Sequence, residues 1–392
     1  MPTRPRKICI STGKRGGFGA LLPVMRMIDG DPSLELQVIV TDMHLNETFG
    51  YTVQEVQRYV QIAEQVSMDQ KGDSARDRAG ALGRCMDGMA AALDRLRPDI
   101  VVLLGDRSET LATAFTCVEM GIPLAHIQAG DQSGGLDDIH RAAITKLSHL
   151  HFSQTEHQAK RVLALGEEPW RVTVSGAPYI DRIVAQQFTD AATVRNQFNL
   201  DPSAPMFVVL QHSDTYEPQN SYAAMRATLE ATQSVAAQAL VCYPCSDQGY
   251  AGVIRAIEEF KDERGFLIQQ NVDSVDFLGL LAIANVMVGN SSSAIIEAPY
   301  FNLPAVNVGN RQRGRERGAN VIDVKPTREA IVSGLRKAAS HEFRDWLQKQ
   351  PRPFGDGTAS DKIVEVLRAV TMGPKLFEKP QLATAIREGD NL

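Results

Sequence analysis

The sequence lacks a long apolar run, an excess of positive charge and a signal peptide. No stretch approaches the ~18 apolar residues that cross a bilayer, and the start, MPTRPRKICIST, lacks the apolar segment of a secretory leader. We therefore expect no membrane segment. With 41 Lys and Arg against 47 Asp and Glu, the net charge is −6, so no global positive field favours nucleic acid as a partner.

Cysteine is also scarce. Five cysteines in 392 residues are odd in number and widely spread, which argues against a disulfide scaffold and favours a reducing, cytoplasmic location. Cys242 and Cys245 have thioredoxin-like spacing, but they end a predicted strand and do not begin a helix, so a redox role is the less favoured interpretation. His149 and His151 share one face of a strand without nearby partners, and we expect no metal.

Short β-rich runs alternate with helical periodicity along the whole chain, a pattern typical of parallel sheets. The predicted strands are 7–11, 36–41, 100–105, 124–128, 150–153, 172–175, 207–211, 239–242, 266–269, 286–288 and 305–308. The predicted helices include 53–66, 79–96, 109–120, 137–148, 155–165, 221–236, 274–284 and 360–370. The alternation predicts an α/β protein with two doubly wound, Rossmann-like domains.

The polar, proline-containing segment 188–205 interrupts the strand pattern and marks the expected boundary. We expect an N-terminal domain over 1–188, a C-terminal nucleotide-binding domain over 189–371 and a tail over 372–392. Ligands of such sheets sit at the carboxyl ends of the strands. The cleft between the two domains is therefore the expected site.

Glycines and charged residues follow the strands of the first domain. Segment 11–19, after which we expect a helix to open at Ala20, is either a phosphate-binding loop or a flexible turn; it matches neither dinucleotide fingerprint nor P-loop. Gly105-Asp106-Arg107 is either a capped helix start with an ion pair or part of a catalytic site.

The following loop of the first domain holds three carboxylates, Asp131, Asp137 and Asp138. Such crowding is unfavourable unless cations or a ligand meet them. One of the last two can simply cap the next helix, so the loop alone leaves both interpretations open.

The second domain offers hydroxyls and guanidinium groups. His212 follows a buried strand and is either a ligand contact or a structural histidine. Ser291 and Ser292 begin a helix, where they bind phosphate or only cap it, and Glu297 can accept from ribose hydroxyls. Four arginines within residues 311–317, set among glycines, favour pyrophosphate recognition.

This ordered set of motifs resembles the hydrolysing UDP-N-acetylglucosamine 2-epimerase family, especially its sialic-acid branch in bacterial nonulosonic acid synthesis. The match covers most of the chain and is carried by Arg15, 43–45 with 49–52, 105–107, 137–138 with 141–149, 211–212, 289–292 and 311–321. The resemblance implies a GT-B-like pair of Rossmann-like domains with a UDP-sugar between them. It also implies no cofactor and a homodimer or dimer-based homo-oligomer.

The resemblance also implies roles for individual residues. The nucleotide and phosphates would be held by Arg15, His212, Ser291, Ser292, Glu297, Arg311 and Arg315. Asp106, Asp131 and Asp137, together with His212, would serve catalysis, and further substrate contacts would come from His44, Arg107, Gln128, Asp138 and Arg141. In the implied reaction UDP leaves as the sugar C2 proton is removed, and water adds to the resulting glycal to give the free sugar inverted at C2.

Two positions depart from the family pattern. The first loop reads Arg15-Gly16-Gly17-Phe18 where Arg-x-Asp-Tyr is usual, and Gln128 stands where glutamate is common. An amide cannot accept the proton. Either the aspartates carry the acid–base work or the substrate and reaction differ; we favour an active enzyme for a UDP-2-acetamido sugar, UDP-N-acetylglucosamine or a modified derivative. A GT-B glycosyltransferase and a non-catalytic nucleotide-sugar-binding protein are the alternatives.

Overall fold

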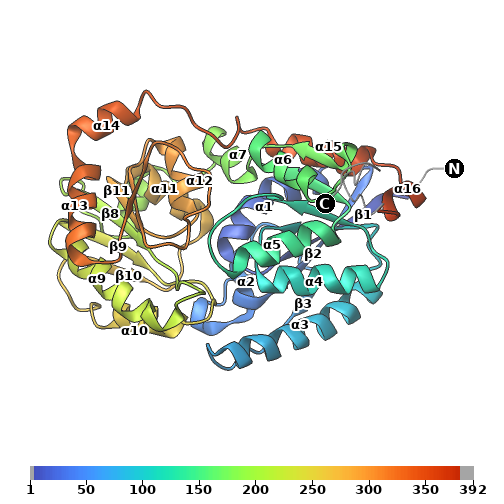
Figure 1. Cartoon of the computed structure of the whole chain (residues 1–392), viewed down its shortest axis with the longest axis horizontal. Helices are drawn as coiled ribbons and strands as arrows, with labels where there is room; N and C mark the ends of the chain where they lie inside the picture. Colours follow the sequence, from blue (N-terminus) through green and yellow to red (C-terminus); the bar gives the residue numbers. More distant parts are fainter. Residues whose placement is uncertain (1–3, 380–392) are drawn as a thin grey trace, which may run out of the picture.

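Two lobes, each built on a parallel sheet, make up the protein (Figure 1). The structure is a computed structural model that describes residues 4–379. Within that range no helix is long and apolar enough to cross a membrane. The first sheet has the order β3-β2-β1-β4-β5-β6-β7, with strands β1 (Arg6–Thr12), β2 (Leu34–Thr41), β3 (Glu64–Val66), β4 (Ile100–Leu104), β5 (Leu124–Ile127), β6 (Leu150–Ser153) and β7 (Val172–Val174).

Helices cover both faces of the first sheet, which explains why its inner strand β4 is apolar throughout. On one face Ile8 and Ile10 of β1 pack with Phe18 of α1, and on the other Cys9 packs with residues of α3 and α4. The helices that follow the strands are α1 (Arg15–Asp29), α2 (Val53–Gln57), α3 (Ala75–Leu96), α4 (Ser108–Glu119), α5 (Leu136–Leu147), α6 (Glu156–Ala164) and α7 (Pro178–Val184).

The second sheet has the order β10-β9-β8-β11-β12-β13 and is likewise buried between two apolar clusters. Its strands are β8 (Met206–Leu210), β9 (Gln238–Cys242), β10 (Phe266–Gln269), β11 (Val286–Gly289), β12 (Ala305–Val308) and β13 (Val321–Val324). Its helices are α8 (Ala191–Gln197), α9 (Ser221–Gln233), α10 (Tyr250–Glu258), α11 (Ser274–Ile283), α12 (Ser293–Ile296), α13 (Arg328–Ala339) and α14 (His341–Leu347). The predicted α/β class with two doubly wound sheets is confirmed.

Three local predictions were wrong. The helix expected over 53–66 ends at Gln57, and residues 64–66 form the edge strand β3; strand β13, at the edge of the second sheet, was not predicted. Both β3 and β13 lie at the edge of a sheet and pair on one side only. An edge strand can therefore be short and, like β3 with Glu64 and Gln65, carry polar residues. Helix α1 begins at Arg15 instead of Ala20.

The chain returns to the first lobe at its end. Figure 1 shows the last segment leaving α14 and crossing to α15 (Ala359–Ala369) and α16 (Pro374–Phe377) over the first sheet. Ile363 and Leu367 of α15 are buried in the same cluster as Ile8. The domain boundary at 188 stays a prediction, and the sequence pattern did not indicate this return. Residues 380–392 of the predicted tail lie outside the described part of the chain.

Candidate active site

A cavity between the lobes gathers most of the predicted site residues at the carboxyl ends of the strands. Its wall includes Arg15, Asp106, Asp137, His212, Ser291, Ser292, Glu297, Arg311 and Arg315. The other predicted residues do not line it: His44, Arg107, Gln128, Asp131, Asp138 and Arg141. Residues at the carboxyl ends of β1, β4, β8, β9 and β11 line the cavity, which is where doubly wound folds place their ligands.

Asp106 directly follows β4 and forms an ion pair with Arg141, a buried arginine of α5. Burial opposes ionisation of Asp106, but the positive charges of Arg141, Lys14 and Arg315 outweigh it and lower the pKa of the carboxyl. Asp106 is therefore an anion at neutral pH. Arg141 also binds Asp138 at 2.8 Å, so it holds the acidic loop from behind the cavity wall.

Asp137, in the first turn of α5, has the opposite shift. Burial, reinforced by the negative charge of Asp106, raises the pKa of Asp137 to about 6. The cavity thus holds a permanently ionised carboxylate beside a carboxyl that titrates near neutral pH. Such a pair suits acid–base chemistry, because a group with a pKa near the working pH both takes and gives a proton readily.

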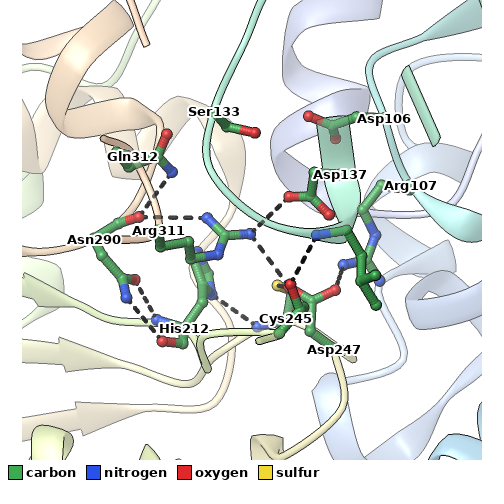
Figure 2. Close-up of polar contacts among 12 residues, drawn as sticks. Asp106, Arg107, Ser133, Asp137, His212, Cys245, Asp247, Asn290, Arg311 and Gln312 are labelled. Atoms are coloured by element: carbon green, nitrogen blue, oxygen red, sulfur yellow. Dashed lines mark hydrogen bonds and ion pairs between the residues drawn. The ribbon is translucent and has the colours of Figure 1, made fainter. Parts of the chain in front are cut away.

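Two arginines of the segment after β12 enter the cavity between acidic side chains. Arg311 lies 3.5 Å from Asp137 and 3.3 Å from Asp247, and its Nη1 donates to the Asn290 carbonyl at 3.3 Å (Figure 2). Arg315 forms an ion pair with Asp131. Both guanidinium groups therefore point between the lobes, where a diphosphate can bind them bidentately.

His212 is held as a neutral donor. Its Nδ1 accepts a hydrogen bond from the Cys245 backbone N–H at 3.0 Å, which places the ring proton on Nε2. Burial lowers the pKa of His212 well below its usual value. The side-chain amide of Asn290 binds both backbone groups of His212, at 2.7 and 2.9 Å (Figure 2), and so ties the ends of β8 and β11 together.

The serine segment follows β11 through a close backbone contact. Gly289 has φ +131°, and a Cβ there would lie 2.1 Å from the Leu210 carbonyl oxygen, so only glycine fits. Ser291 and Ser292 then turn toward the cavity ahead of the short helix α12. Burial raises the pKa of Glu297, just after that helix, to about 7.

Two more of the predicted residues, His44 and Gln128, are buried behind the cavity wall. His44 is fully buried between the hydroxyls of Thr12 and Thr52, at 3.1 and 2.7 Å, and burial lowers its pKa to about 4. Gln128, with a left-handed φ of +71°, donates to Asp131 at 2.9 Å.

Arg107, also buried behind the wall, crosses to the second lobe and pairs with Asp247. Cys242 and Cys245 are both free thiols, and the Cys245 Sγ donates to Asp247 at 2.9 Å. Among residues 4–379, no three His, Cys, Asp or Glu side chains are grouped to hold a metal ion.

Sequence reasoning missed several residues at the cavity. Lys14, Tyr179, Arg182 and Cys245 line it, and Asp247 binds one of its arginines, Arg311. The position of a residue after a predicted strand could have indicated Cys245 and Asp247, which follow β9, and Lys14 directly precedes Arg15. Tyr179 and Arg182 lie on α7, away from any strand end.

Comparison with known proteins agrees with this geometry. The model of the family described as UDP-N-acetylglucosamine 2-epimerase matches residues 26–368. The chain belongs to this family. It is therefore related to enzymes of the epimerase class. A UDP-N,N'-diacetylbacillosamine 2-epimerase (hydrolyzing) of Legionella pneumophila is 32% identical over 375 residues, 95% of this chain and 98% of the relative.

Two further members of the family are informative. A GDP/UDP-N,N'-diacetylbacillosamine 2-epimerase (hydrolyzing) of Campylobacter jejuni is 30% identical over 86% of this chain and 89% of the relative. The crystal structure of UDP-GlcNAc 2-epimerase from Neisseria meningitidis, bound to UDP-GlcNAc, superposes with a TM-score of 0.78 at 17% identity, over 92% of this chain and 99% of that one. The GT-B-like arrangement of two Rossmann-like domains is confirmed.

Proposed function

We propose that the protein is a hydrolysing 2-epimerase of a UDP-2-acetamido sugar, with a 2,4-diacetamido sugar of the N,N'-diacetylbacillosamine type as the favoured substrate. The observation that carries the proposal is the pair Asp106 and Asp137, whose pKa values are shifted in opposite directions beside two inward-pointing arginines. The names of the Legionella and Campylobacter relatives support the choice of sugar. The product would serve nonulosonic, sialic-type acid or surface polysaccharide synthesis.

The difficulty of the reaction is that the sugar C2–H is not adjacent to a carbonyl group. Its proton leaves only if the bond from C1 to the diphosphate breaks at the same stage. Arg311, Arg315 and the Nε2–H of His212 face the cavity and stabilise the negative charge that develops on the departing UDP. The hydroxyls of Ser291 and Ser292 are placed to bind the same phosphates.

We assign removal of the C2 proton to Asp137. A base with a pKa of about 6 is ionised at pH 7 and is stronger than Asp106, whose pKa lies below its ordinary value. Asp106, ionised during this half-reaction, offsets the positive charge that develops at C1. The product of this half-reaction is a glycal and UDP.

Water then adds to C1 of the glycal, and a proton returns to C2. Inversion requires that this proton arrive on the face opposite to the one it left. One carboxyl fixed on one side of the ring cannot serve both faces, so we assign the second transfer to Asp106, which takes a proton from the water as the water oxygen bonds to C1 and passes that proton to C2. Asp137 releases the first proton to solvent, and both aspartates are therefore required. Gln128, which cannot accept a proton, holds Asp131 at 2.9 Å instead.

The test is NMR of a panel of UDP-2-acetamido sugars in deuterated water. The proposal predicts UDP release together with a free sugar that is inverted at C2 and carries deuterium there, and loss of both in Asp106→Asn. Release of UDP only when an acceptor is added would indicate a glycosyltransferase. Recovery of every bound UDP-sugar unchanged would indicate a binding protein, and either result overturns the proposal.

A further inference from the structure

Arg311 is shared between carboxylates of the two lobes. Its Nη2 lies 3.5 Å from Asp137 of the first lobe and 3.3 Å from Asp247 of the second (Figure 2). A bound diphosphate would also bind the guanidinium group of Arg311. The residue that fixes the position of this group therefore decides where in the cavity the phosphates bind.

Asp247 lies between two arginines of different lobes. One of its oxygens pairs with Arg107 of the first lobe and the other with Arg311. Arg107 is itself fixed by Asp42 and Glu109, each at 3.1 Å. Asp247 is only 8% exposed, and such a buried carboxylate is tolerated because both arginines balance its charge.

This carboxylate does not line the cavity, yet it lies beside Arg311, which does. Burial opposes its ionisation, but the charges of Arg107 and Arg311 lower the pKa of Asp247, so it remains an anion at all working pH values. A fixed negative charge there repels a diphosphate. A negative charge at this position favours binding only if the positioning of Arg311 by Asp247 outweighs the repulsion between Asp247 and the diphosphate.

On the basis of the proposed function, we propose that Asp247 is a positioning residue that aims Arg311 at the diphosphate and, by binding Arg107 across the interface, does so only when the lobes are closed. Asp247 also affects the pKa of Asp137, the proposed base. Burial and Asp106 are the main causes of the raised pKa of Asp137, the charge of Asp247 adds to them, and Arg311 and Arg107 oppose them. Removing the charge of Asp247 therefore lowers the pKa of Asp137.

The test compares Asp247→Asn with the wild type and with Asp273→Asn. Asp273 also makes an ion pair between the lobes, with Arg58, but does not contact Arg311. UDP affinity, measured by isothermal titration calorimetry, should fall about tenfold in Asp247→Asn and change little in Asp273→Asn. The acidic limb of kcat/KM should move to lower pH by about half a unit to one unit, which a loss of stability alone would not cause.

Asp247→Glu keeps the charge in a longer side chain. We expect it to retain the wild-type acidic limb while losing UDP affinity, and it replaces Asp247→Asn if that variant does not fold. Wild-type UDP affinity with an unmoved limb in Asp247→Asn, or wild-type kinetics in Asp247→Glu, overturns the inference. If the wild-type protein turns over no UDP-sugar, the proposed function fails, and the UDP affinities still decide the role of Asp247.

Discussion

The two aspartates of the cavity show how much the surroundings of a carboxyl decide its chemistry. Both aspartates line the cavity, yet Asp106 has Arg141 as a close partner, whereas Asp137 pairs, among the residues that the structure describes, only with the more distant Arg311, at 3.5 Å. The difference keeps Asp106 ionised and leaves Asp137 to titrate near pH 6. The division of roles in the proposed mechanism rests on this contrast.

Replacing the proposed base tests it directly. Asp137→Asn removes the proton acceptor but keeps the shape of the side chain, so kcat should fall by about 10²–10⁴-fold, while UDP still binds. UDP release and UDP affinity are the two measurements. Asp87→Asn, an exposed aspartate of α3, is the matched control and should behave as wild type. A kcat within a factor of a few of wild type in Asp137→Asn would remove this residue from the mechanism.

The pH dependence of kcat/KM follows from the same residue. A base must be ionised, so protonation of Asp137 should make kcat/KM fall tenfold per unit below about pH 6 and level off above it. Glu297, with a pKa of about 7, titrates nearby. Because we assign the fall of kcat/KM below about pH 6 to Asp137 and not to Glu297, this fall should persist in Glu297→Gln. A profile that is flat from pH 5 to 7 would contradict the assignment.

At the scale of elements, one buried arginine anchors the last helix of the first lobe. Arg171 is 2% exposed and donates to three carbonyls at the end of α16, those of Lys375, Leu376 and Glu378, each at 2.9 Å. These are carbonyls that a helix end leaves without partners. The side chain thus does for α16 what a C-terminal capping residue does elsewhere.

Arg171→Met should release this helix. We expect the free energy of unfolding to fall by about 3 kcal/mol, because several buried carbonyls lose their donor. Urea denaturation measures the loss, and limited proteolysis near residue 375 reports the freed segment. Arg328→Met, an exposed arginine at the start of α13, should leave both unchanged. Equal stability of the two variants would contradict the anchoring role.

The sequence predicted most strands well but missed two of the four edge strands, β3 and β13. The strands 150–153, 266–269 and 305–308 were placed at their observed bounds because their apolar runs are interrupted sharply. Strand β3 has too few apolar residues to be distinguished from the helix before it. The start of α1 was misplaced because its glycines suggest a loop. In the structure at least one of them serves packing: a Cβ at Gly19 would lie 3.0 Å from Ser274 Cβ, so glycine at this position permits close packing of α1 on the second lobe.

The candidate site divides in the same way. Asp106 and His212 could be predicted because they follow strands, and the fold brings strand ends together. The pairing of Arg311 with Asp247 could not be predicted from the sequence, because it depends on the conformation of loops in the second lobe. The pairing of Arg315 with Asp131 depends further on how the lobes meet, which local patterns do not specify.

At the scale of the whole molecule, polar side chains hold the lobes closed. Arg15 donates to Gln270 and Asn271 of the second lobe, each at 3.1 Å. Glu55 of α2 accepts from the backbone N–H of Ser274 at 2.7 Å and so caps α11 from the other lobe. An interface of this polar kind permits the lobes to separate.

Arg107→Gln should open the molecule. The change leaves the carboxylates of Asp42 and Asp247 facing each other without their shared cation, so the lobes repel. Small-angle X-ray scattering should show a larger radius of gyration than wild type, and UDP should reduce it. Arg226→Gln, which breaks exposed pairs within the second lobe, is the control. Identical scattering curves for Arg107→Gln and wild type would contradict this expectation.

The homodimer or dimer-based homo-oligomer and the cytoplasmic location stay predictions from the sequence. Sedimentation equilibrium should give twice the 42.9 kDa mass of the chain or an even multiple of that mass. A single species at the chain mass, at concentrations up to about 100 times those of an assay, would contradict the dimer.

Because the chain crosses between the lobes twice, both ends of its described part, β1 and α16, belong to the first lobe (Figure 1). The two crossings also touch, since Ala177 N–H donates to the Phe354 carbonyl at 2.8 Å. Fluorophores attached to β1 and to α16 would thus both report on the first lobe. A distance measurement of lobe motion therefore needs its second dye on the second lobe, for example on α10 or α13.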